Sequence, residues 1–353
     1  MNNISLSKLS LLMAIGLFCI AATATAASSS GVPIAHMIAN VSWHQQQNAM
    51  FCGDGALETV YDYFGPDIDQ KAIADVARSS SSGTWTYDMV RAGQFSYLSA
   101  AQGQFFPHAA PTAGYPERPL GYAAFSNSAD NIWLQELKAL IAADMPVIVL
   151  MTYEPTGGSG HYRVAIGYND TENAIYMSDP WGRDEKHKTD KTGVVKWTYD
   201  EFQSAWNYSA AGEGHPYFGM IMLPWNVDVT AKGKTDVGST ITINAKVTYP
   251  CPSPFNSSQF PAENSWANIS LPDGMILLSG SKNVSLGEMK AGSTADATWK
   301  AKINGPVSGK SIGVVAKGIV SGHVPEARWT GESVFYPPYD YADAIGGNGS
   351  LVL

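Results

Sequence analysis

The chain has 353 residues, of which 45 % are hydrophobic and 15 % are charged. This composition is typical of a protein that buries a core and excludes a disordered chain, and the length favours two domains. The formal net charge of −9 argues against a nucleic-acid partner, because binding to phosphate requires a basic face.

Residues 1–27 have the composition of an export signal. Lys8 supplies a positive charge, residues 9–20 are almost wholly apolar, and residues 22–27 offer small side chains for cleavage. The apolar run is too short to span a bilayer. We therefore expect a mature chain without a transmembrane segment that is secreted or held at the cell surface.

The region between residues 38 and 224 is expected to contain helices first and then a sheet. Apolar residues at helical spacing predict a helix over residues 52–64 that stops at Gly65-Pro66. Residues 101–125, rich in Gly, Pro, Ala and aromatic side chains, predict a long loop. Further helices are expected over residues 70–78, 87–95, 132–143 and 198–206. Short β-branched and aromatic runs predict an antiparallel sheet, with strands at residues 147–153, 162–168, 174–178 and 218–223.

After Pro224 the pattern becomes all-β, and short alternating runs separated by turn residues favour a β-sandwich. The domain boundary is expected near residue 225. The sandwich should span residues 226–340, and the Gly-rich residues 341–353 are expected to form a frayed tail. The clearest strands are expected at residues 227–231, 240–248, 266–271, 294–302 and 311–316.

Cys52 is the candidate nucleophile. It stands at a predicted helix N-terminus, where unpaired N–H groups and the helix dipole stabilise a thiolate. Gly53 and Gly55 are expected to leave the helix entrance open to a substrate backbone, and Gln46, six residues upstream, offers an amide to an oxyanion. The alternative is a structural cysteine, either buried or paired with Cys251.

Acyl transfer through a thiol also needs a base that returns a proton to the leaving amine. His161 is the best of the seven histidines, because it opens an apolar strand after the sterically thin loop of residues 157–160. Asp179, at the end of the next strand, is expected to orient the imidazole and stabilise its charged form. The alternatives are a histidine satisfied at a strand end and a turn aspartate before Pro180.

Two segments together resemble a known peptidase family. The bacteriocin-processing, double-glycine-type cysteine peptidases have a Gln six residues before a Cys-Gly, and residues 43–57 resemble that start, reading WHQQQNAMFCGDGAL. The second family signature is a His-led strand followed by Asp-Pro, and residues 160–182 resemble it, reading GHYRVAIGYNDTENAIYMSDPWG. Residues 197–206 are similar to the closing helix of the family. The resemblance covers about residues 38–224.

The resemblance implies an α+β, papain-like fold and a cysteine peptidase that acts on a peptide or isopeptide bond of a peptide or protein substrate. It implies that Cys52 is the nucleophile, that His161 is the general base and acid, and that Asp179 orients His161. Gln46 and the Cys52 N–H would form the oxyanion hole, and the six-residue spacing selects Gln46 over its two glutamine neighbours.

Asp54 departs from the family pattern, in which small or proline residues are common after Cys-Gly. A carboxylate two residues beyond Cys52 raises the thiol pKa by repulsion, although it suits a helix start. One alternative function is therefore a catalytically inactive papain-like protein that binds or adheres at the cell surface. Another is an amidase or acyltransferase acting on a non-protein substrate.

The sandwich region weakly resembles the immunoglobulin-like modules of prokaryotic surface proteins, at residues 237–240 and 286–293. Such modules serve adhesion, spacing or sugar binding, which implies a contact with a cell surface or a glycan. Trp266, Trp299 and Trp329 are expected mainly in the sandwich core, with a carbohydrate platform as the alternative. No phosphate loop, Cys/His cluster or His-Glu-x-x-His motif predicts a cofactor or metal.

Overall fold

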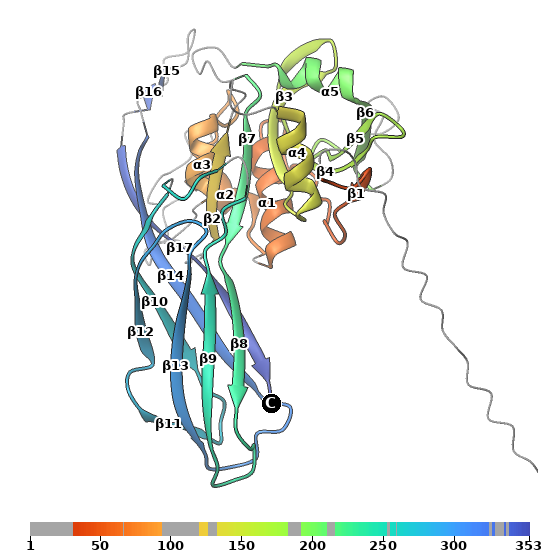
Figure 1. The fold of residues 1–353 in the computed structure, drawn as a ribbon. Helices are drawn as coiled ribbons and strands as arrows, with labels where there is room; N and C mark the ends of the chain where they lie inside the picture. Colours follow the sequence, from red (N-terminus) through yellow and green to blue (C-terminus); the bar gives the residue numbers. More distant parts are fainter. Residues whose placement is uncertain are drawn as a thin grey trace, which may run out of the picture.

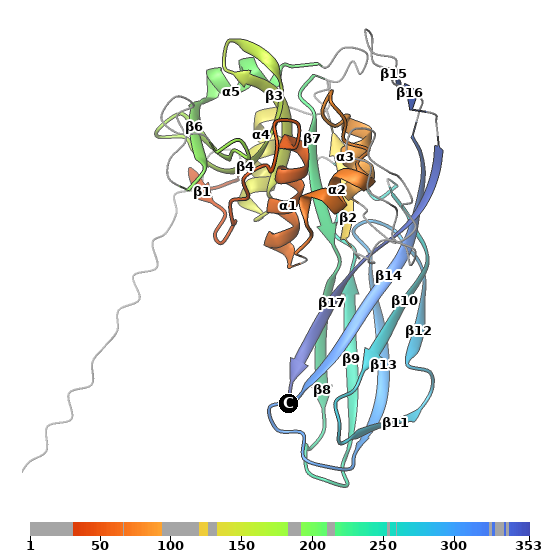
Figure 2. The same ribbon diagram turned by 180° about the vertical axis from the view of Figure 1, so that it is seen from behind.

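The protein contains an α+β unit and an elongated all-β unit, and the chain passes from one to the other at Trp225 (Figures 1 and 2). The predicted export signal and the predicted loop up to residue 119 lie outside the described residues. The computed structural model describes residues 31–65, 67–93, 120–125, 133–182, 192–209, 216–252, 255–258, 260–324, 327–328, 335–336 and 339–353.

The helix α1 spans Cys52–Phe64, and its apolar face explains why it forms. Ala56, Leu57 and Val60 are completely buried on that face. Gly65 ends the helix with φ 114°, a left-handed conformation that glycine adopts without steric cost. The other helices form within two residues of their expected bounds, as α2 Gln70–Val76, α3 Thr86–Gly93, α4 Trp133–Ala142 and α5 Tyr199–Trp206.

The centre of the α+β unit is an antiparallel sheet, which has seven strands in the described part of the chain. The strands are β1 Ala35–Met37, β2 Leu120–Phe125, β3 Val147–Glu154, β4 Gly157–Asn169, β5 Ala174–Ser178, β6 Val194–Thr198 and β7 Gly219–Pro224. Their order is β2-β7-β3-β4-β5-β6, and β1 pairs with the far end of β4. Apolar clusters join α1, α2 and α3 to one face and α4 and α5 to the other, so the sheet is covered on both sides.

Two predictions for this unit are wrong. Residues 157–160, expected as a loop, begin β4, and Glu154 faces Gly157 across the hairpin from β3. Residues 120–125, assigned to the long loop, form β2 and pair with the whole of β7. Both segments are rich in glycine or alanine, which give no β-branched sequence signal for a strand. They form strands because pairing with a neighbouring strand satisfies their backbone hydrogen bonds.

The all-β unit consists of two packed antiparallel sheets of four strands each in the described residues, ordered β12-β10-β14-β17 and β11-β13-β9-β8. Strand alternation directs Ile241, Ile243 and Val247 of β9 into the core between the sheets. The strands are β8 Asn226–Lys232, β9 Thr240–Thr248, β10 Ala262–Ser270, β11 Met275–Ser279, β12 Asn283–Met289, β13 Thr294–Ile303, β14 Ser311–Val324 and β17 Tyr339–Val352, and a separate pair is made by β15 Ala327–Arg328 and β16 Phe335–Tyr336.

The predicted frayed tail of residues 341–353 is instead most of β17, which pairs with β14 along its whole length. Its glycines allow close approach to the junction between the two units. The Trp225 N–H donates to the Gly346 carbonyl at 2.9 Å, and a Cβ on Gly347 would lie 1.9 Å from the Trp225 carbonyl oxygen. A glycine run therefore marks a tightly packed strand here rather than a flexible end.

A side chain at residue 347 is expected to disrupt this junction. Gly347→Val should lower the free energy of unfolding by about 2 kcal/mol or more, because the added atoms overlap buried backbone of Trp225. Ser350→Val, at an exposed position of the same strand, is the matched control and should change stability by less than about 0.5 kcal/mol. Thermal and urea unfolding measure both, and equal stabilities would contradict the packing argument.

The tryptophans of the sandwich do not form a common platform. Trp299 is buried in the core, whereas Trp266 is half-buried on the outer side of β10, with the Lys317 ammonium 5.6 Å from its ring centroid. Trp329 lies outside the described residues. A carbohydrate platform that includes Trp299 is therefore wrong, because this side chain faces the opposite sheet. Among the described helices, none is long and apolar enough to cross a membrane.

Candidate active site

Cys52 is the first residue of α1 and is partly exposed in a pocket of about 360 Å³. The N-cap residue, Phe51, has no polar side chain, so no side chain caps the helix start. The sulfur lies against β4, where it is hydrogen-bonded by the backbone of Tyr162, the residue that directly follows His161. The fold therefore brings the helix start and the His161 strand together.

The pKa of the Cys52 thiol is raised to about 11. Burial of the sulfur is the largest cause, and the nearby Asp54 carboxyl adds to it, while backbone hydrogen bonds from Tyr162 and Gly53 lower the pKa. The stabilisation expected from the helix start is thus present but is outweighed by desolvation. The thiol needs a neighbouring base in order to ionise near neutral pH.

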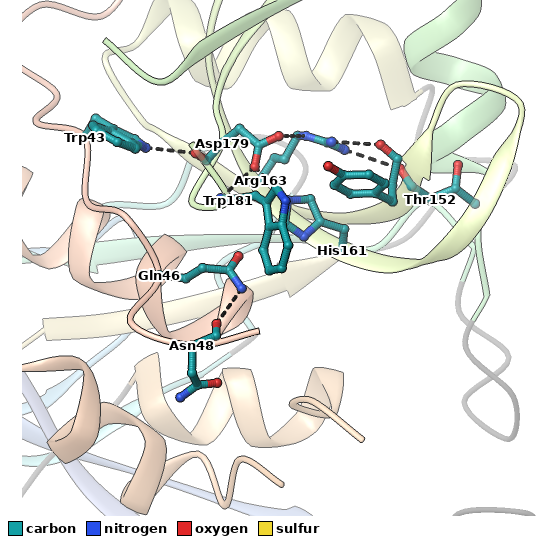
Figure 3. A network of polar contacts seen from close by, with 9 residues as sticks. Trp43, Gln46, Asn48, Thr152, His161, Arg163, Asp179 and Trp181 are labelled. Atoms are coloured by element: carbon teal, nitrogen blue, oxygen red, sulfur yellow. Dashed lines mark hydrogen bonds and ion pairs between the residues drawn. The ribbon is translucent and has the colours of Figure 1, made fainter. Parts of the chain in front are cut away.

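His161 and Asp179 form a buried pair. His161 is on β4, Asp179 directly follows β5, and their Nε2 and Oδ1 atoms are 2.7 Å apart (Figure 3). The exposed fractions are 4 % and 0 %. Burial acts to raise the pKa of Asp179, but the charges of His161 and Arg163 hold it well below its ordinary value. The carboxylate is therefore ionised, and it fixes which imidazole nitrogen faces away from it.

Arg163 is a residue that the sequence analysis missed. Its Nε donates to Asp179 Oδ2 at 2.9 Å, and its other nitrogens donate to the carbonyls of Thr152 and Tyr153 at 3.3 and 2.8 Å (Figure 3). The guanidinium is 2 % exposed and lies 4.6 Å from the Trp197 ring centroid. The only sequence signal is a charged residue at an inward position of an otherwise apolar strand, which by itself predicts a buried partner.

Trp43 fixes the other side of the Asp179 segment. Its indole N–H donates to the Asp179 carbonyl at 2.8 Å (Figure 3). A Cβ on Gly182 or Gly193 would lie 1.9 or 2.3 Å from the Trp43 ring, so both glycines are required for this close packing. The Trp181 N–H also donates to Asp179 Oδ1, at 2.9 Å. Together with its contacts to His161 and Arg163, this bond gives the Asp179 carboxylate partners in three directions, which fix its orientation.

Gln46 is the buried member of its glutamine triplet, at 8 % exposure, and lies just before α1. Its backbone N–H donates to the Pro180 carbonyl at 2.7 Å, which ties it to the Asp179 segment. Its side-chain Nε2 donates to the Asn48 carbonyl at 2.7 Å (Figure 3). One of the two amide hydrogens is thereby committed, and the second is the donor that an oxyanion would use.

Gly53 and Gly55 serve packing rather than substrate access, contrary to expectation. A Cβ on Gly53 would lie 2.7 Å from the Met89 sulfur, and one on Gly55 would lie 3.0 Å from the Pro180 ring. Both residues are buried. They allow the start of α1 to approach α3 and the segment after β5, which is how Cys52 reaches the other site residues.

Asp54 is completely buried at the start of α1. Burial raises its pKa to about 8, although a hydrogen bond from the Ser79 hydroxyl to Oδ1, at 2.9 Å, acts in the opposite direction. Its Oδ2 atom is buried without a hydrogen-bond partner among the described residues. The carboxyl is therefore mostly protonated at pH 7, which reduces the expected repulsion of a Cys52 thiolate.

The expected alternative of a Cys52–Cys251 disulfide is wrong, since both cysteines are free. Cys251 lies in the sandwich, packed at the edge of its core. In the described part of the chain, no group of three or more His, Cys, Asp and Glu side chains is arranged to hold a metal ion.

The profile described as the Peptidase_C39 like family matches residues 38–212. No curated protein matches the sequence. The peptidase domain of Streptococcus ComA, a bi-functional ABC transporter involved in a quorum-sensing pathway, is a similar solved structure, with 16 % identity, TM-score 0.33, and 52 % of this chain and 97 % of that chain covered.

Two further solved structures are similar. One is a double glycine motif protease from an AMS/PCAT transporter in complex with the leader peptide, with 15 % identity, TM-score 0.33, and coverage of 53 % of this chain and 93 % of that chain. The other is xylellain, a cysteine protease from Xylella fastidiosa, with 13 % identity, TM-score 0.37, and coverage of 56 % and 89 %. Residues 38–212 are thus similar to the Peptidase_C39 like family, and the chain is a cysteine-type peptidase.

Proposed function

We propose that the chain is a secreted peptidase that hydrolyses peptide or isopeptide bonds through a Cys52 thioester, with His161 as base and Asp179 as its orienting group. The observation that carries the proposal is the buried His161–Asp179 pair, 2.7 Å apart, in which His161 lies on β4 directly before Tyr162, whose backbone is hydrogen-bonded to the Cys52 sulfur. In this arrangement the nucleophile lies beside the base and the base lies beside its orienting group, which is the arrangement that acyl transfer requires.

In the proposed reaction, the Cys52 thiol passes its proton to His161 Nδ1 as the sulfur attacks the scissile carbonyl carbon. Because Asp179 holds Nε2, the ring presents Nδ1 for this transfer. The Cys52 N–H and the second Gln46 amide hydrogen bind the oxyanion. His161 then gives the proton to the leaving amine, and a water molecule deprotonated by the same ring hydrolyses the thioester.

The raised thiol pKa favours proton transfer that accompanies attack over a thiolate formed in advance. A thiol with a pKa near 11 is neutral at pH 7 unless its proton has an acceptor. His161 is that acceptor in the proposal, and Asp179 stabilises the imidazolium that results. The rate at which Cys52 reacts with an electrophile therefore reports directly on whether His161 accepts its proton.

Alkylation by iodoacetamide tests the proposal, with Cys251 as an internal control. Cys52 should react at least about tenfold faster than Cys251 at pH 7, and His161→Ala should remove that advantage. Cys52→Ser and Cys251→Ser variants assign the labelled residue by mass spectrometry. Equal, slow rates at both cysteines would reject the peptidase proposal and favour a papain-like protein that only binds a peptide.

Gln46→Ala is expected to lower kcat about 10²- to 10³-fold with little change in KM, because an oxyanion donor acts mainly in the transition state. Gln45→Ala and Gln47→Ala are matched controls at exposed neighbouring positions, and both should stay within about twofold of the parent enzyme. Peptide hydrolysis measured for the three variants decides the register. A larger loss in either control would move the role from Gln46 to that residue.

Export is part of the same proposal and rests on the composition of residues 1–27. N-terminal sequencing of protein recovered outside the cell should begin after the small residues at 22–27. We further propose that the sandwich is immunoglobulin-like and contacts a cell surface or glycan, supported by its two packed four-stranded sheets in the described residues. Pull-down of the full chain by cell-surface polysaccharide, lost on removal of the sandwich, would support that role.

A further inference from the structure

Gln70 is a buried glutamine at the start of α2, outside the residues so far assigned to the active site. It is 1 % exposed, which is unusual for a glutamine. Asp69 caps the helix by accepting from the Lys71 N–H at 2.9 Å, and this bond defines the start of α2. The helix packs beside α1 through a shared apolar cluster (Figure 2). Gln70 is therefore held in a defined place against α1.

Both hydrogens and the oxygen of the Gln70 amide make hydrogen bonds. Nε2 donates to the Gln45 carbonyl at 2.9 Å and to Glu58 Oε2, and Oε1 accepts from the Gln47 N–H at 2.9 Å. The reverse orientation of the amide would place Oε1 against two acceptors and Nε2 against a donor. The three bonds therefore select one orientation, and they join residues 45 and 47 to α1 through Glu58.

Gln46, the proposed oxyanion donor, lies between the two residues that Gln70 holds. This segment forms no helix or strand, so no ladder of backbone hydrogen bonds orders it. In the peptide bond before Gln46, the carbonyl accepts from Gln70 Nε2 and the N–H donates to the Pro180 carbonyl at 2.7 Å. In the peptide bond after Gln46, the N–H donates to Gln70 Oε1. With both of these peptide planes fixed, the Cα–Cβ bond of Gln46 has a defined direction.

The side chain of Gln46 depends on this backbone for its position. Its Nε2 makes one hydrogen bond, to the Asn48 carbonyl, and its Oε1 is buried without a partner among the described residues. An oxyanion donor must lie about 2.7–3.1 Å from the developing charge, and a displacement of about 1 Å costs roughly 10²-fold in rate. A small movement of the Gln46 backbone is therefore expected to lower the rate of the reaction.

We propose that Gln70 is a positioning residue of the peptidase, which holds the backbone on both sides of Gln46 so that the Gln46 amide meets the oxyanion. The proposal rests on the proposed function and adds a residue to it. Gln70 is buried and does not line the pocket beside Cys52, so it acts through Gln46 rather than on the substrate. Its loss should lower kcat about ten- to hundredfold and change KM by less than about twofold.

Gln70→Met tests the proposal in the full chain, because methionine keeps the length of the side chain and makes none of the three hydrogen bonds. The constants kcat and KM are measured on one quenched fluorogenic peptide, chosen from a random-sequence library by its cleavage by the parent enzyme. Gln203→Met, at an exposed position of α5, is the matched control and should leave both constants within about twofold. A Gln70→Met enzyme with the parent kcat would overturn the proposal.

A double-mutant cycle with Gln46→Ala separates positioning from a general effect on the fold. If Gln70 acts through Gln46, Gln70→Met should lower kcat less than about threefold in a chain that already has Gln46→Ala. Equal losses in both backgrounds would show a general structural role and overturn the proposal. If Gln70→Met does not fold, the cycle is measured with Gln70→Glu, which has the same size but at most one donor for the two acceptors that Gln70 serves.

Alkylation of Cys52 by iodoacetamide distinguishes the possible failures. This reaction forms no oxyanion, so Cys52 should react at the parent rate in Gln70→Met although hydrolysis is slowed. An alkylation rate that falls as far as kcat would place the effect at the Cys52–His161 pair and overturn the proposal. Fast alkylation in the parent with an unchanged kcat in Gln70→Met rejects the Gln70 role alone. Slow alkylation in the parent with no cleavage of any peptide rejects the peptidase function, and the Gln70 role with it.

Discussion

Asp179→Asn is expected to lower kcat/KM for peptide hydrolysis by about 10⁴-fold. The carboxylate accepts at Oδ2 from Arg163 Nε and at Oδ1 from the Trp181 N–H, and Oδ1 also contacts His161 Nε2. An asparagine amide has one acceptor and one donor end. In either orientation, its NH₂ group faces a buried donor from Arg163 or Trp181.

The orientation that keeps the Arg163 bond is the informative one. It places the amide NH₂ against His161 Nε2, which must then act as an acceptor and carry its proton on Nδ1. A ring in that tautomer cannot take the proton of Cys52, so the loss appears in kcat rather than in KM. Arg163 is thus a positioning residue: by holding the amide oxygen, it imposes the wrong His161 tautomer in Asp179→Asn, in addition to the loss of the negative charge.

Asp200→Asn is the matched control, since it makes the same change at an exposed position of α5 and should leave kcat/KM within about twofold. The pH dependence supplies a second measurement. Because the pKa of Asp179 is depressed in the folded state, its stabilisation is present above the ordinary pKa near 4 and is lost as pH falls below it. Asp179→Asn should lack that acid-dependent loss, and an active, normally folded variant would contradict the assigned role.

Asp54→Asn is expected to become progressively more stable than the parent protein as pH rises. The pKa of Asp54 is about 8 in the folded state against an ordinary value of 3.8. Below pH 4 the carboxyl is protonated in both folded and unfolded chains and has no pH-dependent effect. Between pH 4 and 8 the unfolded chain ionises first, so the folded parent loses stability that the neutral amide does not lose.

The full difference amounts to at most about 6 kcal/mol and is complete above pH 8. Urea unfolding at a series of pH values measures it, and the constant packing difference between Asp and Asn cancels in the slope. Asp228→Asn, at an exposed position of β8, should follow the parent protein. Parallel stability curves for Asp54→Asn and the parent would show that this carboxyl ionises normally in the folded protein.

The same substitution should alter reactivity at alkaline pH. Ionised Asp54 raises the pKa of the Cys52 thiol by repulsion, so the parent enzyme acquires this effect as pH passes through about 8. Asp54→Asn should therefore alkylate faster than the parent above pH 8 and similarly to it at pH 6. A protonated Asp54 at neutral pH is compatible with an acidic residue two positions after the proposed nucleophile.

Local sequence patterns determined the elements that carry the candidate site. The period of apolar residues after Cys52 specified α1, and a capping box joining Thr198 and Glu201 starts α5 as predicted. Strands β5 and β9 have their predicted bounds, because alternation and flanking turn residues are properties of neighbours in the chain. Cys52 at a helix start, His161 at a strand start and Asp179 at a strand end were likewise named as candidates before any contact was known, and the family resemblance added the choice of Gln46 and the roles of all four.

The tertiary structure alone decided how those residues behave. The pairing of Arg163 with Asp179 joins β4 to the segment after β5, and the pocket beside Cys52 combines side chains from separate parts of the chain. The Gly-rich end became β17 because β14 pairs with it and the Trp225 backbone packs against it. Burial also reversed the expected direction of the Cys52 pKa, since desolvation depends on atoms that are distant in sequence, whereas a helix start is a local feature.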